Sequence, residues 1–106
     1  MKSAEVRVLT EHEARVLIIH EIAPSPSISN ICTLMRVCFS KQCTHEEVRA
    51  LCEELSWYEF LELSSSTTQT YIITTKGRVA VRHTKKVTRR RGIHFTDYIN
   101  TSHLTV

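Results

Sequence analysis

Apolar residues recur at the spacing of an amphipathic helix in three segments of the chain. The first segment is 10–22, where Thr10 and Glu13 have the spacing of a capping box and two prolines follow the last apolar position. The second begins after Ser27 or Ser29 and ends near residue 40. Its predicted buried face consists of Ile28, Ile31, Leu34, Met35 and Cys38. These patterns predict two helices separated by a proline-containing loop.

A second capping box, formed by Thr44 and Glu47, opens the third helical segment, 44–56. The apolar face of this segment consists of Val48, Leu51, Cys52 and Leu55. Residues 41–43 leave only a short turn between the second and third predicted helices. Two helices joined by a turn of this length are typical of the helix-turn-helix motif.

After the third segment, the helical spacing of apolar residues gives way to alternation. Aromatic and β-branched residues in 58–63 and 70–75 predict two strands, and the polar run 64–69 predicts the loop of a hairpin. A fourth helix is predicted over 76–86, although the valines in and beside this segment also suit a strand. The residues that can cap this helix are Thr74 and Thr75.

Length and composition favour one α+β domain. The chain has 106 residues, of which 42% are hydrophobic and 24% charged, and only 2 Gly and 2 Pro argue against a disordered chain. We expect a domain over 1–87 followed by a basic C-terminal tail, 88–106; segment 5–9 fits either a short strand or a helical extension. No apolar run approaches the roughly 20 residues of a membrane helix, and the N-terminus lacks a secretory pattern, so we expect a cytoplasmic protein.

The charged residues divide unevenly along the chain. Residues 1–66 carry 6 Lys or Arg and 10 Glu, a net charge of −4, whereas residues 67–106 carry 8 Lys or Arg and one Asp, a net charge of +7. This asymmetry points to a polyanionic partner. The alternative is a basic helix and tail that are simply solvated.

The order helix, helix, turn, helix, hairpin, helix resembles the winged helix-turn-helix domain. Within it, Leu55–Leu63 followed by Thr70–Arg78, read as Thr-Tyr-Ile-Ile-Thr-Thr-Lys-Gly-Arg, is similar to the wing and exit segment of small MarR- and PadR-like regulators. Similar single-domain proteins are common in archaea and their viruses, and the resemblance covers about 10–86. It implies sequence-specific binding of double-stranded DNA by a small transcriptional regulator, without catalysis.

In such a fold the third helix lies in the major groove, its N-terminus directs backbone donors at phosphate, and loop 64–69 reaches the minor groove. Arg49 is the expected base-edge or phosphate contact. The full set of candidate DNA contacts is Arg36, Lys41, Gln42, Thr44, His45, Arg49, Lys76, Arg78, Arg89, Arg90 and Arg91. A homodimer is expected, with 10–22 and 93–106 as candidate dimer elements.

The resemblance leaves two alternatives open. Loop 64–69 has no Lys or Arg, and the third helix carries four glutamates, at positions 46, 47, 53 and 54. One alternative is a protein-interaction module whose acidic third helix docks on a basic partner. The other is a protein that binds single-stranded nucleic acid through the basic and aromatic segment 89–98.

Four cysteines lie within 21 residues but form no Cys-x-x-Cys pair, so the common zinc and thioredoxin spacings are absent. We expect reduced thiols that pack in the core, with Cys43 in the turn as the redox candidate and Cys32 and Cys38 as possible disulfide partners. The six histidines are scattered, and the two glycines are isolated. The sequence therefore predicts no metal site, no cofactor, no small-molecule substrate and no enzyme.

Overall fold

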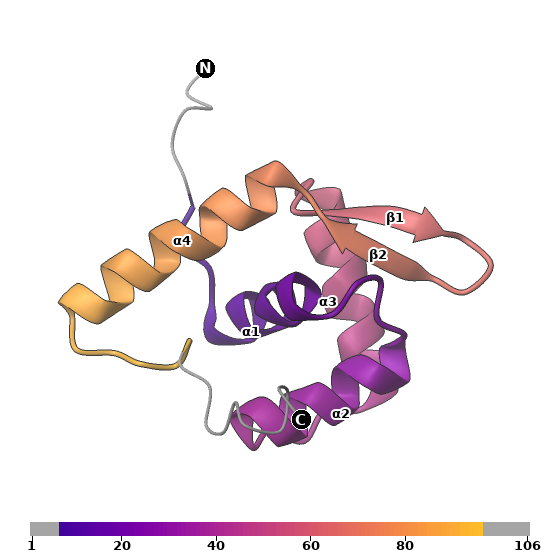
Figure 1. Cartoon of the computed structure of the whole chain (residues 1–106), viewed down its shortest axis with the longest axis horizontal. Helices are drawn as coiled ribbons and strands as arrows, with labels where there is room; N and C mark the ends of the chain where they lie inside the picture. The colour runs from indigo at the N-terminus through magenta and orange to yellow at the C-terminus, as the bar shows by residue number, and fades with distance from the viewer. Residues whose placement is uncertain (1–6, 97–106) are drawn as a thin grey trace.

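Four helices and one antiparallel hairpin make up the computed structural model, which describes residues 7–96 (Figure 1). The elements are α1 (Glu11–Ile22), α2 (Ile28–Phe39), α3 (His45–Trp57), β1 (Leu61–Ser65), β2 (Thr70–Ile73) and α4 (Thr75–Arg90). The predicted α+β class and the order of its elements are therefore confirmed. Of segment 5–9, whose structure the sequence left open, residues 7–9 belong to neither a helix nor a strand. No helix in the described range is long and apolar enough to cross a membrane.

Helix α1 is the centre of the fold and packs against α2, α3, α4 and β2. In Figure 1 it lies between α4 on one side and α2 on the other. Eight consecutive residues, Glu13–His20, are buried, so this helix is enclosed on all sides rather than on one apolar face. The predicted dimer element 10–22 therefore lies largely inside the domain. Segment 93–106, the other predicted dimer element, is described only as far as residue 96.

The predicted helix starts are confirmed by their caps. Both capping boxes form: the backbone N–H of Thr10 donates to Glu13 Oε1 at 2.9 Å, and that of Thr44 donates to Glu47 Oε1 at 2.9 Å. Of the alternatives left by the sequence, Ser27 caps α2, and Thr74 caps α4. Side-chain oxygens at these positions satisfy backbone N–H groups that have no partner within the helix.

The first strand starts later than the sequence predicts. Strand β1 begins at Leu61 and not at residue 58, because the chain turns sharply after α3. In this turn Glu59 has a left-handed φ of 69°, and the N–H of Phe60 donates to the carbonyl of Leu55 at 2.9 Å. The strands pair in the register Leu61↔Ile73, with a bulge between residues 63 and 65.

The fourth helix is longer than predicted: it ends at Arg90, whereas the sequence predicted an end at residue 86. Its second half is held by two buried threonines. The Oγ1 of Thr84 accepts the N–H of Leu9 at 2.9 Å, and the Oγ1 of Thr88 donates to the carbonyl of Thr84 at 2.8 Å. The expected domain boundary at 87/88 thus falls inside α4. After the helix the chain returns to α1, where Arg15 Nε donates to the carbonyl of Phe95 at 3.0 Å.

Candidate nucleic-acid interface

Positive charge is concentrated on α4. This helix carries seven Lys or Arg in 16 residues and no acidic residue. Arg78, Arg82, Lys85 and Arg89 recur at i, i+4, i+7 and i+11, which places them along one side of the helix; we call these four residues the basic stripe. At 1.5 Å per residue the stripe is about 16 Å long. Three of its members are exposed and Lys85 is half-buried.

The opposite side of α4 explains why the stripe faces outward. The buried residues Gly77, Ala80, Val81, Thr84 and Thr88 lie on the side that packs against the body of the protein. Gly77 sets the approach, because a Cβ built at this position lies only 2.4 Å from the carbonyl oxygen of Phe60. The helix N-terminus can therefore cross the base of the hairpin closely only with glycine at position 77.

The stripe has little negative charge around it. Among residues 7–96, no ion pair engages Arg78, Arg82 or Lys85. Lys76 differs from them: its Nζ lies 3.6 Å from Glu59 Oε1 and 5.6 Å from the centre of the Phe60 ring. Lys76, a predicted DNA contact, is therefore directed at the hairpin base and partly neutralised there.

The three consecutive arginines lie at the C-terminal end of α4. Arg89 and Arg90 form the last turn of α4, and Arg91 is its C-cap residue. All three are exposed. In Figure 1 this end of α4 and the tip of the hairpin lie at opposite ends of the long horizontal axis. The structure therefore separates the three arginines from the hairpin loop, although the sequence assigned both to one DNA surface.

Helix α3 presents carboxylates to solvent. The four exposed acidic residues of this helix are Glu46, Glu47, Glu53 and Glu54. Its exposed basic residue is Arg49, and His45 is also exposed. The fold does not turn these glutamates away from the surface. Carboxylates on a helix that enters a groove would repel phosphate, so α3 is electrostatically a poor major-groove helix.

One contact joins α3 to the hairpin loop. Arg49 Nε donates to Gln69 Oε1 at 3.2 Å, and both side chains are exposed. Gln69 has a left-handed φ of 54° at the end of the loop, which directs its side chain back to the helix. The sequence indicated a polar loop but gave no signal that this residue meets Arg49.

The α2–α3 turn is already engaged within the molecule. Thr44 uses its backbone N–H and its hydroxyl in the capping box of α3, so this N–H group is not available to a phosphate. Lys41 Nζ lies 3.8 Å from Glu11 Oε2. Gln42 is exposed in this turn, and Arg36 is exposed on α2. The predicted contacts in this region are therefore scattered rather than gathered into one site.

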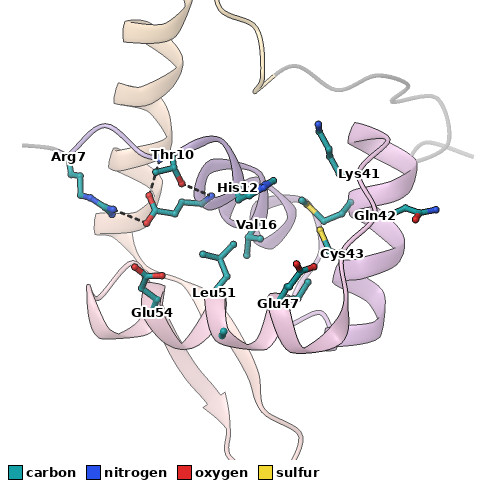
Figure 2. Close-up of a pocket in the computed structure, with 14 residues that line it drawn as sticks. Arg7, Thr10, His12, Val16, Lys41, Gln42, Cys43, Glu47, Leu51 and Glu54 are labelled. Carbon is teal, nitrogen blue, oxygen red and sulfur yellow. Dashed lines mark hydrogen bonds and ion pairs between the residues drawn. The ribbon is translucent and has the colours of Figure 1, made fainter.

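A cleft of about 590 Å³ opens between the start of α1 and α3 (Figure 2). Val16 and Leu51 contribute its apolar lining. On its rim, Arg7 Nη2 lies 2.8 Å from Glu13 Oε2. The remaining charged or titratable lining residues are His12, Lys41, Cys43, Glu47 and Glu54. Positive and negative groups alternate around this cleft, so it does not continue the basic surface of α4.

The four cysteines are free thiols. Cys38 and Cys52 are buried, and Cys32 and Cys43 are half-buried. Burial raises the pKa of the Cys52 thiol to about 12 and is also the largest cause of the raised pKa of the other three. A raised pKa disfavours the thiolate, which is the reactive form, so none of the four has the environment of an activated nucleophile.

Within residues 7–96, no group of three or more His, Cys, Asp or Glu side chains is arranged to hold a metal ion. The predicted residues that the fold does gather are the cations of α4, and those that it leaves apart are the cations of α2, the turn and α3. Comparisons with protein-family models, curated proteins and solved structures give no match for this chain.

Proposed function

We propose that the protein binds double-stranded DNA and acts as a small, sequence-specific transcriptional regulator with a winged-helix fold. The observation that carries this proposal is the basic stripe of α4, which is exposed at three of its four positions and has no acidic residue on its own helix. Each phosphate that a cation neutralises releases a counterion, so such a stripe supplies affinity for any duplex.

The chemistry of α4 favours duplex over single-stranded nucleic acid. Proteins that bind single strands combine cations with aromatic side chains on which bases stack. Helix α4 has no aromatic residue. Phe95 packs against the core, and its carbonyl is held by Arg15. Tyr98, the other aromatic residue of the proposed single-strand segment, lies outside the described residues.

Sequence specificity is assigned in this proposal to the corner between α3 and the hairpin. The hydrogen bond between Arg49 and Gln69 supports that assignment, because it fixes a guanidinium group beside the hairpin loop. An arginine at such a corner can donate two hydrogen bonds to guanine or one to phosphate. Because exposed glutamates lie near Arg49, the proposal gives it a role in base recognition and assigns the affinity to α4.

The experiment is a mobility-shift titration of duplex DNA at several salt concentrations. If the four stripe residues and Lys86 each contact one phosphate, log affinity falls against log salt with a slope of about −4 to −5. A variant with Arg78→Gln, Arg82→Gln and Lys86→Gln reduces that slope to about −2. The control removes two exposed or half-buried cations outside α4, Arg36→Gln with Lys41→Gln, and it keeps the slope within about 1 of the parent.

The same assay tests the specificity assignment. Arg49→Ala is expected to weaken binding to a duplex selected from a random pool by about 1–3 kcal/mol while leaving random duplex unchanged. Equal losses on both DNAs would remove Arg49 as a base reader. A flat salt titration of the parent protein would overturn the proposed function itself.

A further inference from the structure

A second stripe, of opposite character, runs along the exposed side of α3. Glu46, Ala50, Glu53 and Trp57 recur at i, i+4, i+7 and i+11, and all four are exposed; we call them the acidic stripe. Trp57 is 79% exposed, and its indole contacts the edge of Tyr58 at a centroid distance of 5.3 Å. A large aromatic side chain in water next to two carboxylates is the usual composition of an interaction anchor.

The two stripes have the same spacing. In the basic stripe of α4, cations stand at i, i+4, i+7 and i+11 from Arg78 to Arg89, which matches the positions from Glu46 to Trp57 in α3. Two helices that lie side by side and parallel therefore place Glu46 and Glu53, about 10 Å apart along α3, opposite two cations of α4. The indole face can receive the guanidinium group at one end of the row, an arrangement favourable for arginine and tryptophan.

Two other charged side chains of α3 make hydrogen bonds outside the acidic stripe. Arg49 lies next to Glu46 and Glu53 on the helix surface, but its Nε donates to Gln69 in the hairpin loop. Glu47 is held by the cap of α3. Glu46 and Glu53 of α3 thus point negative charge to solvent, and no ion pair engages them among residues 7–96. The same holds, with positive charge, for Arg78 and Arg82 of α4.

We propose that the acidic stripe of α3 in one copy of this protein docks on the basic stripe of α4 in a second copy. Within each chain α3 and α4 both pack against α1, and the two stripes lie on different helices. The contact joins two different patches, is therefore head-to-tail, and can add further copies. It places Glu46 against Arg78 and Glu53 against Lys85, and it removes Trp57 from water.

This contact uses the same α4 surface that we assign to DNA, and it does not depend on that assignment. Duplex DNA and the acidic stripe of another copy would compete for the basic stripe, because both present rows of negative charge. The test of self-association is carried out without DNA. Absence of DNA binding would therefore not contradict self-association, and absence of self-association would not contradict DNA binding.

The experiment measures the mass of the full-length protein by light scattering and the emission of its single tryptophan. In about 0.01 M salt the mean mass is expected to rise above the monomer value of 12.2 kDa with protein concentration, and Trp57 emission to shift to the blue. In about 1 M salt both effects are lost, because charges are screened within about 3 Å. A mass of 12.2 kDa in low salt at every concentration overturns the proposal.

Charge reversal identifies the surfaces. Glu46→Lys with Glu53→Lys, and separately Arg78→Glu with Arg82→Glu, are each expected to leave a monomer in low salt, whereas an equimolar mixture of the two variants associates again. Recovery in the mixture shows that both variants are folded. The matched control reverses glutamates outside the stripe, Glu21→Lys with Glu62→Lys, and keeps the parent mass. Association of the Glu46→Lys and Glu53→Lys variant alone, or a mixture that stays monomeric, overturns the proposal.

Discussion

The hydroxyl of Thr84 accepts the backbone N–H of Leu9 at 2.9 Å, in the buried interior and across 75 positions of the sequence. It joins the segment before α1 to the middle of α4, and Leu9 itself is buried. The bond satisfies a backbone donor that has no place in a helix or strand. A single polar side chain therefore holds the N-terminal segment and the last helix together.

Replacing this hydroxyl should be costly. Thr84→Val keeps the shape of the side chain but leaves the N–H of Leu9 buried without an acceptor, and we expect unfolding free energy to fall by about 1–3 kcal/mol. Urea denaturation followed by circular dichroism measures it. Thr88→Val is the matched control. The hydroxyl of Thr88 donates to a carbonyl that the helix already uses, so losing this bond should lower the unfolding free energy by under about 1 kcal/mol. Equal costs at the two positions would contradict this assignment.

Gly77 is required for space and Gly92 for backbone conformation. At Gly77 a Cβ would lie 2.4 Å from the carbonyl oxygen of Phe60 and 2.9 Å from Ile73 Cγ1. Gly77→Ala should destabilise the protein by about 1–3 kcal/mol, although alanine is normally the better helix former by about 1 kcal/mol.

The second glycine provides the comparison for that experiment. Gly92 has a φ of 73° and no atom within 4 Å of a built Cβ. Asparagine tolerates this left-handed backbone, so Gly92→Asn should change stability by under about 0.5 kcal/mol. Gly77→Asn should unfold at a temperature several degrees lower, by about 4–8 °C for each kcal/mol lost. Thermal melts of the parent and of the Gly77→Ala, Gly77→Asn and Gly92→Asn variants measure these differences. They show whether lack of space at Gly77 costs more than the left-handed backbone at Gly92.

Stability should fall in acid because of His20. This imidazole is buried, its Nδ1 lies 2.8 Å from the carbonyl oxygen of Val16, and burial lowers its pKa below the ordinary value of 6.5. Below pH 6.5 the unfolded chain binds a proton that the folded chain does not, so unfolding free energy decreases as the pH falls. Above pH 6.5 the side chain is neutral in both states, and its contribution to stability is fully present.

Denaturant titrations between neutral pH and about pH 5 measure this dependence. His20→Leu should flatten the pH dependence, because it removes the group that titrates differently in the two states. His12→Gln removes an exposed imidazole and is the matched control. If His20→Leu retains the full acid sensitivity of the parent, another group is responsible for it.

Thiol labelling should proceed in two groups. Cys32 and Cys43 are half-buried and should be alkylated first in the native protein, whereas Cys38 and Cys52 should wait for unfolding. The pKa of about 12 for Cys52 leaves almost no thiolate near neutral pH. Intact mass measured over time should show two fast additions, and four in denaturant. With Cys32→Ser and Cys43→Ser the fast phase should disappear; rapid labelling of Cys52 would show that α3 opens readily.

The sequence predicted those parts of the fold that rest on local chemistry. The hydroxyls of Thr10 and Thr44 each accept the backbone N–H of the residue three positions later, and such short-range patterns are visible in the sequence. The hairpin was visible because aromatic and β-branched residues favour strands in both of its arms. The order of elements followed from these local signals.

Long-range contacts set the features that the sequence did not reveal. Arg15 is buried in α1, where it pairs with Glu11, donates to Phe95 and lies 5.2 Å from the ring of Phe39. A charged residue in an amphipathic pattern is normally read as exposed, so no sequence rule places it inside. The extra length of α4 was missed for the same reason, since the burial of Thr88 follows from tertiary packing. In the candidate site, the cations of α4 were predicted, but their separation from the hairpin tip depends on how α4 crosses α1.

The bulge between residues 63 and 65 limits what the hairpin can do. A sheet of two strands has no interior strand, so each strand presents one row of unpaired backbone groups to solvent. Here the rows are four or five residues long, and the bulge interrupts the regular spacing of donors and acceptors. A third strand, from another molecule or a peptide, would find few consecutive positions at which to add. Assembly by strand addition, the route to amyloid-like growth, is thus discouraged by the hairpin itself.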